Sequence, residues 1–388
     1  ADFATNGFNN VDIFERTEKF GVFYGHWKQS EKFGYFQQRQ PSMGARIKLA
    51  RSRPGGRHDY IMMGSNDYLG LAAHPAVAEA AVQAIREFGF GSTGTPHTSG
   101  YSVVHDRLRA KLAQMYGKED ALIYASGYSA NVGIVSGLCR EQDLIVADVL
   151  SHASLHDGIA LSRAACRLFK HNDMAHLRKI LEENRAQYAG CLIITEGAFS
   201  MDGTIGKLDE IYALAREFDA RIMIDQAHCM GVVGAHGLGT VEKYDLVQET
   251  DVIMGLFSKS LGTVGGFVVG SSNLCNWLRS FSRAFIFASS FPPSTAAATL
   301  KSLELMQNEG LTQRLQENIR HFVKGMRQIG APLDPNHETA IIPIEIRNEE
   351  KLGKMYQSLL DSGVAVVPVV YPVVSRNRSR FRFSVRAD

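Results

Sequence analysis

The stretch Ile224-Asp225-Gln226-Ala227-His228 places an acid directly after the short apolar run 221–224. The stretch Phe257-Ser258-Lys259-Ser260-Leu261-Gly262 places a lysine in the same way after the apolar run 252–256. Both runs are typical of buried strands, because they are short, apolar and end at polar residues. Open α/β sheets bind ligands at the carboxyl ends of their strands, so Asp225 and Lys259 are candidate site residues.

A lysine and a carboxylate in these positions suit pyridoxal phosphate (PLP). This cofactor needs a lysine that holds its aldehyde as a Schiff base and a carboxylate that keeps its ring nitrogen protonated. Lys259 and Asp225 are the candidates for these two roles. A single acid after a strand is usually a turn residue and a single lysine is usually a solvated surface residue, so this interpretation depends on the remaining sequence.

Short apolar strands alternate with amphipathic helices over most of the chain beyond Tyr60. Helical spacing occurs at 76–88, 104–116, 173–185 and 208–218, and buried strands are expected at 121–124, 143–149, 191–195, 221–224 and 252–256. This alternation is typical of an α/β fold in which helices cover both faces of a mostly parallel sheet. After a helical stretch at 295–308 the pattern changes to shorter strands at 339–346, 364–372 and 379–385 and a helix at 350–361.

The length of 388 residues exceeds the size at which single cores stop growing, so a large domain and a smaller one are expected. We expect an N-terminal arm over 1–59, a large PLP-binding domain over 60–294 and a smaller C-terminal α+β domain over 295–388. The arm interleaves aromatic and basic side chains, a pattern that also occurs where bases of single-stranded nucleic acid stack. We favour packing of this segment on a partner subunit. The side chains are Phe20, Phe23, Tyr24, Trp27, Phe33, Tyr35 and Phe36, with Lys28, Lys32 and Arg39.

The charge of the chain is nearly balanced, with 42 Lys and Arg against 40 Asp and Glu and a formal net charge of +2. This balance leaves no electrostatic footprint for nucleic acid or an anionic membrane. The five cysteines are widely spaced and lack a CxxC or histidine pattern, which argues against a disulfide framework and a zinc site and favours a cytoplasmic setting. No apolar run is long enough to span a bilayer, and residues 1–10 lack the features of a signal peptide.

Other strand ends carry further candidates. The turn Ser126-Gly127-Tyr128 follows 121–124 and opens a helix, whose free N–H groups suit a phosphate, although such a turn alone is usually only a helix cap. His152 follows the next strand, where an imidazole can stack on a pyridine ring, although a lone histidine there is more often structural. His228, three residues after Asp225, can reach the phenolic oxygen of the cofactor.

Six motifs in a common order make the chain resemble the α-oxoamine synthases, a family that includes serine palmitoyltransferase, aminooxononanoate synthase, aminoketobutyrate ligase and aminolevulinate synthase. The motifs are Gly64-Ser65-Asn66-Asp67-Tyr68-Leu69-Gly70-Leu71, Ser126-Gly127-Tyr128-Ser129-Ala130-Asn131, Ser151-His152-Ala153-Ser154, Phe199-Ser200-Met201-Asp202-Gly203, Asp225-Gln226-Ala227-His228 and Ser258-Lys259-Ser260. The resemblance implies a PLP-dependent transferase of fold type I and a homodimer with shared active sites. It also implies decarboxylative condensation of a small amino acid with an acyl thioester, carried by coenzyme A or an acyl carrier protein, to an α-amino ketone, carbon dioxide and free thiol.

The same resemblance implies a role for each matching residue. Lys259 is the Schiff-base lysine and, once released, the general base at the substrate α-carbon. Asp225 partners the ring nitrogen, His152 stacks on the ring, and His228 and Ser200 lie near the phenolic oxygen. The phosphate is implied to be held by Ser126, Gly127, Tyr128 and Ser258, with Ser289 and Ser290 of the neighbouring subunit. Asn66 and Arg382 match positions that meet the amino-acid carboxylate, which suits the planar fork of arginine.

The chain departs from the family pattern at several positions. Gln226 stands where relatives commonly have Asp or Glu, and Leu256 replaces a Thr that supplies one phosphate hydroxyl. Pro96 and His97 stand where many relatives have an arginine, which leaves the usual acyl-substrate contact without that side chain. The family pattern also continues beyond Arg382 through a closing helix, so we expect the C-terminal domain of this chain to be truncated.

Two other classes of function stay open at this point. The first is another PLP reaction, such as aldol cleavage or transamination, which needs the same lysine and acid. Release of free thiol and carbon dioxide would distinguish a synthase from both. The second is a non-catalytic subunit that supports an active partner, against which Lys259, Asp225 and His228 together argue. The chain also fits a domain of a larger biosynthetic synthase.

Overall fold

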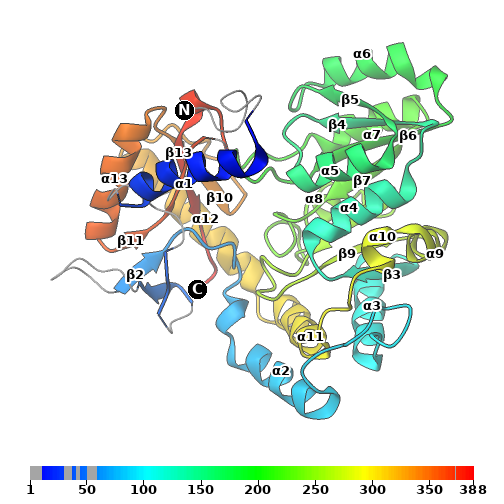
Figure 1. The fold of residues 1–388 in the computed structure, drawn as a ribbon, viewed down its shortest axis with the longest axis horizontal. Helices are drawn as coiled ribbons and strands as arrows, with labels where there is room; N and C mark the ends of the chain where they lie inside the picture. Colours follow the sequence, from blue (N-terminus) through cyan, green and yellow to red (C-terminus); the bar gives the residue numbers. More distant parts are fainter. Residues whose placement is uncertain (1–10, 30–36, 41–43, 50–58, 372) are drawn as a thin grey trace. The chain divides into compact units, whose positions relative to one another are not determined.

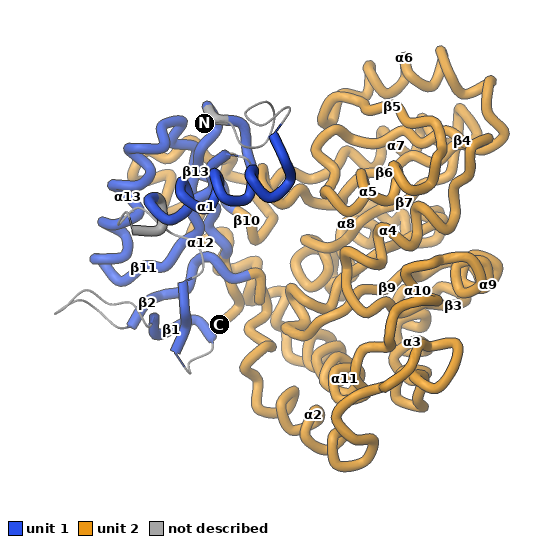
Figure 2. Tube along the Cα trace, viewed as in Figure 1, with its two compact units in different colours: residues 1–65, 342–384 blue, residues 66–341, 385–388 orange. Residues whose placement is uncertain are grey.

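We examined the fold in a computed structural model. It describes residues 11–29, 37–40, 44–49, 59–371 and 373–388. The chain divides into two compact units, of which the smaller takes residues 1–65 and 342–384 and the larger takes residues 66–341 and 385–388 (Figure 2). These bounds differ from the expected domain boundaries at 59/60 and 294/295, which stay predictions.

A seven-stranded sheet, counted over the described residues, forms the centre of the larger unit (Figure 1). Its strand order is β3-β9-β8-β7-β6-β4-β5. The strands are β3 (Asp120–Tyr124), β4 (Asp143–Asp148), β5 (Ala165–Phe169), β6 (Gly190–Glu196), β7 (Arg221–Asp225), β8 (Val252–Leu256) and β9 (Gly266–Gly270). Strands β5, β4, β6, β7 and β8 pair in parallel, whereas β9 runs antiparallel to β8 and β3. The expected mostly parallel α/β sheet is confirmed.

Helices cover this sheet because each presents an apolar stripe to it. Helix α4 packs against β3, β8 and β9, whereas α6 packs against β4 and β5 and α7 against β7. The helices of the larger unit are α2 (Pro75–Phe88), α3 (Val103–Tyr116), α4 (Gly127–Leu138), α5 (Ala153–Ser162), α6 (Met174–Asn184), α7 (Leu208–Glu217), α8 (Thr240–Lys243), α9 (Ser272–Phe281), α10 (Arg283–Ile286), α11 (Pro293–Asn308) and α12 (Leu311–Gln328), with 3₁₀ turns at Leu71–Ala73 and Arg185–Gln187.

The core of the larger unit lies between the sheet and helices α4, α5 and α9. Its members are buried side chains of both the strands and the helices, and the strand members include Ile145, Ile194 and Met254. Strands buried in this way read as continuous apolar runs, which is why the sequence locates them well. The core therefore holds the carboxyl ends of β4, β6, β7 and β8 in fixed register.

The smaller unit contains two three-stranded sheets within the described residues. One has the order β1-β2-β11 and the other β10-β13-β12, so β13 is a central strand. Its elements are α1 (Ile13–Gln29), β1 (Arg46–Lys48), β2 (Asp59–Met62), β10 (Ile341–Glu345), α13 (Glu349–Asp361), β11 (Val364–Ala365), β12 (Val367–Val369), a 3₁₀ turn at Arg376–Arg378 and β13 (Arg380–Ser384). The expected α+β lobe is therefore folded, including the strand that carries Arg382.

The aromatic N-terminal segment is partly described. Phe20 and Phe23 are exposed on helix α1, and their ring centroids lie 6.0 Å apart. The residues Lys32, Phe33, Tyr35 and Phe36 lie outside the described residues. Packing of this segment on a partner subunit stays a prediction.

Among the described residues, no helix is both long and apolar enough to cross a membrane. In the same part of the chain, no group of three or more His, Cys, Asp or Glu side chains is arranged to hold a metal ion. The five cysteines are free thiols, of which Cys139, Cys191, Cys229 and Cys275 are buried.

Candidate active site

Four neighbouring strands bring the central candidate residues to one edge of the large sheet. The order β8-β7-β6-β4 places the carboxyl ends of these strands side by side. Asp225 and Glu196 are the last residues of β7 and β6, and Lys259 and His152 follow β8 and β4. Glu196 and Asp225 are direct register partners in the parallel β6–β7 pair. The expectation that polar residues gather at this edge follows from the parallel topology.

Lys259 lies in hydrogen-bond contact with His228. The Nζ atom of Lys259 is 2.7 Å from Nε2 of His228, and Nδ1 of His228 is 2.7 Å from the hydroxyl of Tyr68. Tyr68 also donates to Oδ1 of Asn66 at 3.2 Å. His228 and Tyr68 are buried, so this row of polar groups has fixed geometry.

Asp225 is a buried carboxylate that receives two hydrogen bonds. Its side chain is at the end of β7, and the residue is only 2% exposed. The Nδ2 atom of Asn131 donates to Oδ2 at 2.7 Å, and the backbone N–H of Ala227 donates to Oδ1 at 2.8 Å. These donors stabilise negative charge in a site that excludes most water.

His152 caps the amino terminus of helix α5. Its Nδ1 atom accepts from the backbone N–H of Ser154 at 3.2 Å and lies 2.7 Å from Oγ of the same serine. The backbone N–H of His152 donates to Oε1 of Glu196 at 2.5 Å. Loss of hydration lowers the pKa of His152 and so favours the neutral imidazole, whereas the charge of Asp225 acts in the opposite direction.

Glu196 is a buried carboxyl group beside Asp225. Burial raises the pKa of Glu196 well above its ordinary value, and the nearby charge of Asp225 raises it further, whereas Lys259 lowers it. Two adjacent carboxyl groups resist simultaneous ionisation. Glu196 also accepts the backbone N–H of His152, so this carboxyl group helps to position the start of helix α5.

Replacing Glu196 with glutamine should change the pH dependence of stability. Because the raised pKa means that the folded state binds the Glu196 proton more tightly than the unfolded chain, the wild type loses stability as pH rises from about 4.5 through the folded-state value. Glutamine does not titrate. The difference in unfolding free energy between Glu196→Gln and wild type should therefore grow with pH by up to about 1.4 kcal/mol per pH unit within that window.

Urea unfolding followed by circular dichroism, repeated between about pH 5 and 8, measures this difference. The matched control is Glu182→Gln on the exposed face of α6, which should leave the pH dependence unchanged. Parallel stability curves for Glu196→Gln and wild type would show that Glu196 titrates as an ordinary glutamate.

The candidate phosphate residues lie around the amino terminus of helix α4. Ser126 caps this helix by accepting from the backbone N–H of Ser129 at 3.1 Å. A Cβ at Gly127 would lie 1.8 Å from Cδ2 of Leu256, so only glycine fits beside this leucine. Leu256 therefore places a methyl group beside the first residue of α4, where the Thr of relatives would supply a hydroxyl.

The remaining candidates for the phosphate and phenolic oxygen are near strand ends of the same unit. Tyr128 is exposed on the first turn of α4, where its hydroxyl contacts Asp157. Ser258 is exposed just after β8, and Ser200 lies in the turn that follows β6. Their positions after the strands agree with the sequence pattern, while their roles stay predictions.

Ser289 and Ser290 differ in their surroundings. Ser289 is exposed in the segment between α10 and α11. The Oγ atom of Ser290 is buried and, among the described residues, has no hydrogen-bond partner, although its backbone N–H donates to Gly94 at 3.0 Å. Their expected reach to the phosphate of a neighbouring subunit stays a prediction.

The two candidate carboxylate residues belong to different units. Asn66 lies in the larger unit and is held by Tyr68, as described above. Arg382 is buried on the central strand β13 of the smaller unit, where its Nη1 atom donates to Oγ of Ser384 at 3.0 Å. The other arginines considered for this role bind carboxylates, since Arg380 pairs with Glu345 at 3.1 Å and Arg386 with Asp67 at 3.2 Å.

The side chain of Gln226 has a structural role, because it is hydrogen-bonded to the first residue of helix α8. Its side chain is fully buried, donates to Oγ1 of Thr240 at 2.9 Å and accepts from the backbone N–H of Thr240 at 2.9 Å. An acid at this position would lose the donated bond. The departure at Gln226 therefore fits the turn that begins α8.

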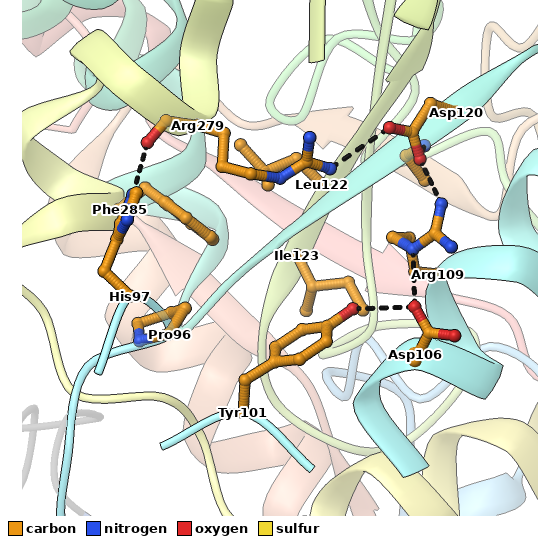
Figure 3. A pocket seen from close by; sticks show the side chains of 11 residues that line it. Pro96, His97, Tyr101, Asp106, Arg109, Asp120, Leu122, Ile123, Arg279 and Phe285 are labelled. Carbon is orange, nitrogen blue, oxygen red and sulfur yellow. Dashed lines mark hydrogen bonds and ion pairs between the residues drawn. The ribbon is translucent and has the colours of Figure 1, made fainter. Parts of the chain in front are cut away.

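Pro96 and His97 line a cavity of about 410 Å³ that contains none of the central residues described above (Figure 3). His97 lies 2.5 Å from the carbonyl oxygen of Arg279, and its ring meets Phe285 edge-on. On the far wall Asp120 pairs with Arg109 at 2.5 Å and with Arg279 at 3.1 Å. The charged groups lining this cavity are thus already paired with one another.

Sequence reasoning assigned no role to Glu196, Asn131, Ser154 or Tyr68, although three of them lie within the quoted motifs. A carboxylate at the end of an otherwise apolar strand was the available signal for Glu196. Asn131 lies one helical turn after Gly127, so its position on the strand-facing side of α4 was also readable. Their partners were not, because those partners lie on other elements.

Comparisons with known proteins agree with the geometry. A family model described as aminotransferase class I and II matches residues 58–388. An 8-amino-7-oxononanoate synthase from Treponema denticola is 39% identical over 328 residues, which cover 84% of this chain and 83% of that protein. A serine palmitoyltransferase from Sphingobacterium spiritivorum is 37% identical over 376 residues, 97% of this chain and 92% of that protein.

Solved structures give the same result. Serine palmitoyltransferase from Sphingomonas wittichii has a TM-score of 0.91 and 30% identity, with 97% of this chain and 94% of that chain covered. The same enzyme from S. paucimobilis, solved with PLP bound, has a TM-score of 0.91 and 29% identity at the same coverage. The expected fold type I architecture is thereby confirmed.

Proposed function

We infer the reaction of this chain from one premise, that it belongs to the class I and II aminotransferase family and, within it, to the α-oxoamine synthases. It is a PLP-dependent acyltransferase that condenses a small amino acid with an acyl thioester, releasing carbon dioxide and free thiol and leaving an α-amino ketone. The observation that supports this reaction most directly is the Lys259–His228 contact at the sheet edge that also carries buried Asp225.

The side chains present fit PLP. A primary amine at Lys259, a buried carboxylate at Asp225 and the amino terminus of helix α4 at Gly127 match its aldehyde, its ring nitrogen and its phosphate. When bound, PLP supplies an electron-accepting ring conjugated to the substrate amine. We assign Ser126, Tyr128 and Ser258 to the phosphate as well, and Ser200 to the phenolic oxygen.

The side chains of this chain then divide the work of proton handling. Lys259, once its amine is free, takes the proton from the substrate α-carbon as general base. His228 lies 2.7 Å from Lys259 and can exchange a proton with it, and Tyr68 orients His228 from the other side. Asp225 would hold the ring nitrogen of the cofactor in its protonated form, and His152 would stack on the ring.

Arg382 is proposed to bind the carboxylate of the amino-acid substrate. Arg382→Lys keeps the charge but loses the two-pronged donor geometry. We expect the KM for the amino acid to rise about tenfold or more while the KM for the thioester changes little, because the loss affects binding of one substrate only. Steady-state kinetics with each substrate varied in turn measure both constants.

The matched control for this variant is Arg378→Lys, since Arg378 is exposed and pairs with Glu345 at 2.9 Å. This control should leave both constants close to wild type. An unchanged amino-acid KM in Arg382→Lys would mean that the carboxylate is held by another residue.

We further propose a homodimer in which Ser289 and Ser290 of one subunit approach the phosphate site of the other. Large apolar side chains near these serines are exposed in the single chain, with Phe287 71% and Phe281 49% exposed, which favours a covered surface. The buried hydroxyl of Ser290, which has no hydrogen-bond partner in the part of the chain that the structure describes, also supports a rearrangement on assembly. Sedimentation analysis of the purified protein tests this state.

The thioester is proposed to come from either coenzyme A or an acyl carrier protein in the cytoplasm. The decisive experiment mixes the purified protein with PLP, one amino acid from a panel and an acyl thioester on each carrier. Release of free thiol and carbon dioxide together, dependent on the amino acid, supports the condensation. Thiol release without carbon dioxide, or transfer of the amino group to a keto acid, would contradict it.

A further inference from the structure

The direction of every hydrogen bond between Asp225 and His152 can be read from the donors and acceptors involved. Asn131 carries two N–H groups on Nδ2, which donate to Oδ2 of Asp225 at 2.7 Å and to Oγ of Ser154 at 3.0 Å. The opposite orientation of the amide would bring its oxygen against the Asp225 carboxylate, which is repulsive. The carboxylate therefore sets the orientation of Asn131.

Ser154 transmits this direction to the imidazole. Since its Oγ accepts from Asn131, its single hydroxyl proton is available for Nδ1 of His152 at 2.7 Å. The backbone N–H of Ser154 also points to this atom, at 3.2 Å. Two donors directed at Nδ1 leave it as the lone-pair nitrogen, so a neutral His152 carries its proton on Nε2.

The chain of groups is protected from water over most of its length. Asp225 is 2%, Asn131 2% and Ser154 1% exposed. Oδ1 of Asn131 is buried and has no hydrogen-bond partner among the described residues, so the repulsion between an amide oxygen and the Asp225 carboxylate, and not complete pairing, sets the direction of this network. On the other side of His152, Glu196 accepts the backbone N–H and so positions the main chain from which the ring extends toward Ser154.

We propose that Asn131 and Ser154 are positioning residues that hold His152 as the Nε2–H tautomer through a hydrogen-bond chain anchored on Asp225. His152 then acts toward a ligand as a hydrogen-bond donor from Nε2 and not as a base. This inference rests on the proposed function only for the identity of the ligand, since the chain of contacts belongs to the protein itself.

Nitrogen NMR tests the tautomer without turnover. Protein labelled with ¹⁵N-histidine, with and without bound PLP, gives long-range proton–nitrogen spectra in which the two ring nitrogens of each of the 13 histidines report the proton position. The His152 signals are assigned by their loss in His152→Gln. The wild type should show Nδ1 unprotonated and Nε2 protonated.

Ser154→Ala removes the hydroxyl donor and retains the backbone N–H, so the tautomer ratio should shift toward Nδ1–H by about five- to tenfold, the effect of one hydrogen bond of ordinary strength. Asn131→Ala should shift the ratio in the same direction, which provides a second variant in case the first folds poorly. The matched control is Ser151→Ala, because Oγ of buried Ser151 has no hydrogen-bond partner among the described residues. Its tautomer ratio should match wild type.

Kinetics then separate positioning from general stability. Ser154→Ala should lower kcat severalfold at a temperature where circular dichroism shows the variant to be fully folded, while Ser151→Ala should retain wild-type kcat. An Nδ1–H tautomer in the wild type, or the same ratio in Ser154→Ala and Ser151→Ala, would overturn the inference. Neither result would affect the proposed function, which depends on thiol and carbon dioxide release.

Discussion

Lys259→Ala should abolish turnover, with kcat at least about 10⁴-fold below wild type, because the variant loses both the covalent anchor for PLP and the general base. The 2.7 Å contact with His228 supports an amine in the correct place for proton transfer, and alanine leaves His228 without that partner. The rate of thiol release in the presence of amino acid and thioester measures the loss.

Borohydride reduction gives a second readout on the same residue. In the wild type it should attach PLP to the peptide that contains Lys259, and peptide mass spectrometry should find no such adduct in Lys259→Ala. The matched control is Lys207→Ala, since Lys207 is a half-exposed lysine whose contact is a surface pair with Glu210. An adduct on a different lysine in the wild type would show that the lysine was assigned wrongly.

Asp225→Asn should retain PLP binding but lower kcat by about 10³-fold, on the order of the largest effects known for removing one electrostatic stabiliser. The substitution keeps the shape and removes the charge. Because Asp225 is only 2% exposed, no counterion from solvent replaces the lost carboxylate charge. The asparagine amide would also face the donors of Asn131 and Ala227, so one of the two present bonds is lost.

The control for this variant is Asp251→Asn, which makes the same chemical change beside the start of β8, at the opposite edge of the sheet. Its turnover should stay within a few fold of wild type. PLP absorbance and kcat are measured on both proteins. A nearly normal rate in Asp225→Asn would assign the ring nitrogen to another carboxylate, of which Glu196 is the neighbouring one.

The elements that were predicted best are those with a simple hydrophobic period. Strand β8 at 252–256 and helix α2 at 75–88 agree with the expected ranges to within one residue. Strand β9 was missed because Gly266 and Gly270 at its ends weaken the strand signal. Strand β5 was missed as well. It lies at the edge of the sheet and is partly exposed, so it tolerates Arg167, which interrupts the apolar run.

The candidate site shows the same division. Lys259, Asp225 and His152 were found from the sequence because each lies at or within four residues of the end of a recognisable strand. The roles of Asn131 and Tyr68 were not, since Asn131 meets a carboxylate 94 positions away and Tyr68 meets a histidine 160 positions away. Glu196 was passed over because its importance comes from a register partner on β7.

The fold class, the cofactor chemistry and the first residues of the site could all be predicted from the sequence, because hydrophobic period and residues at strand ends are local properties. The tertiary fold was needed to show which buried groups share hydrogen bonds, that Glu196 and Asp225 are neighbours and which way the imidazole of His152 is oriented. These properties depend on the order and register of β8, β7, β6 and β4, and on burial, which sets the energy of each charge. No local pattern in the chain encodes that order.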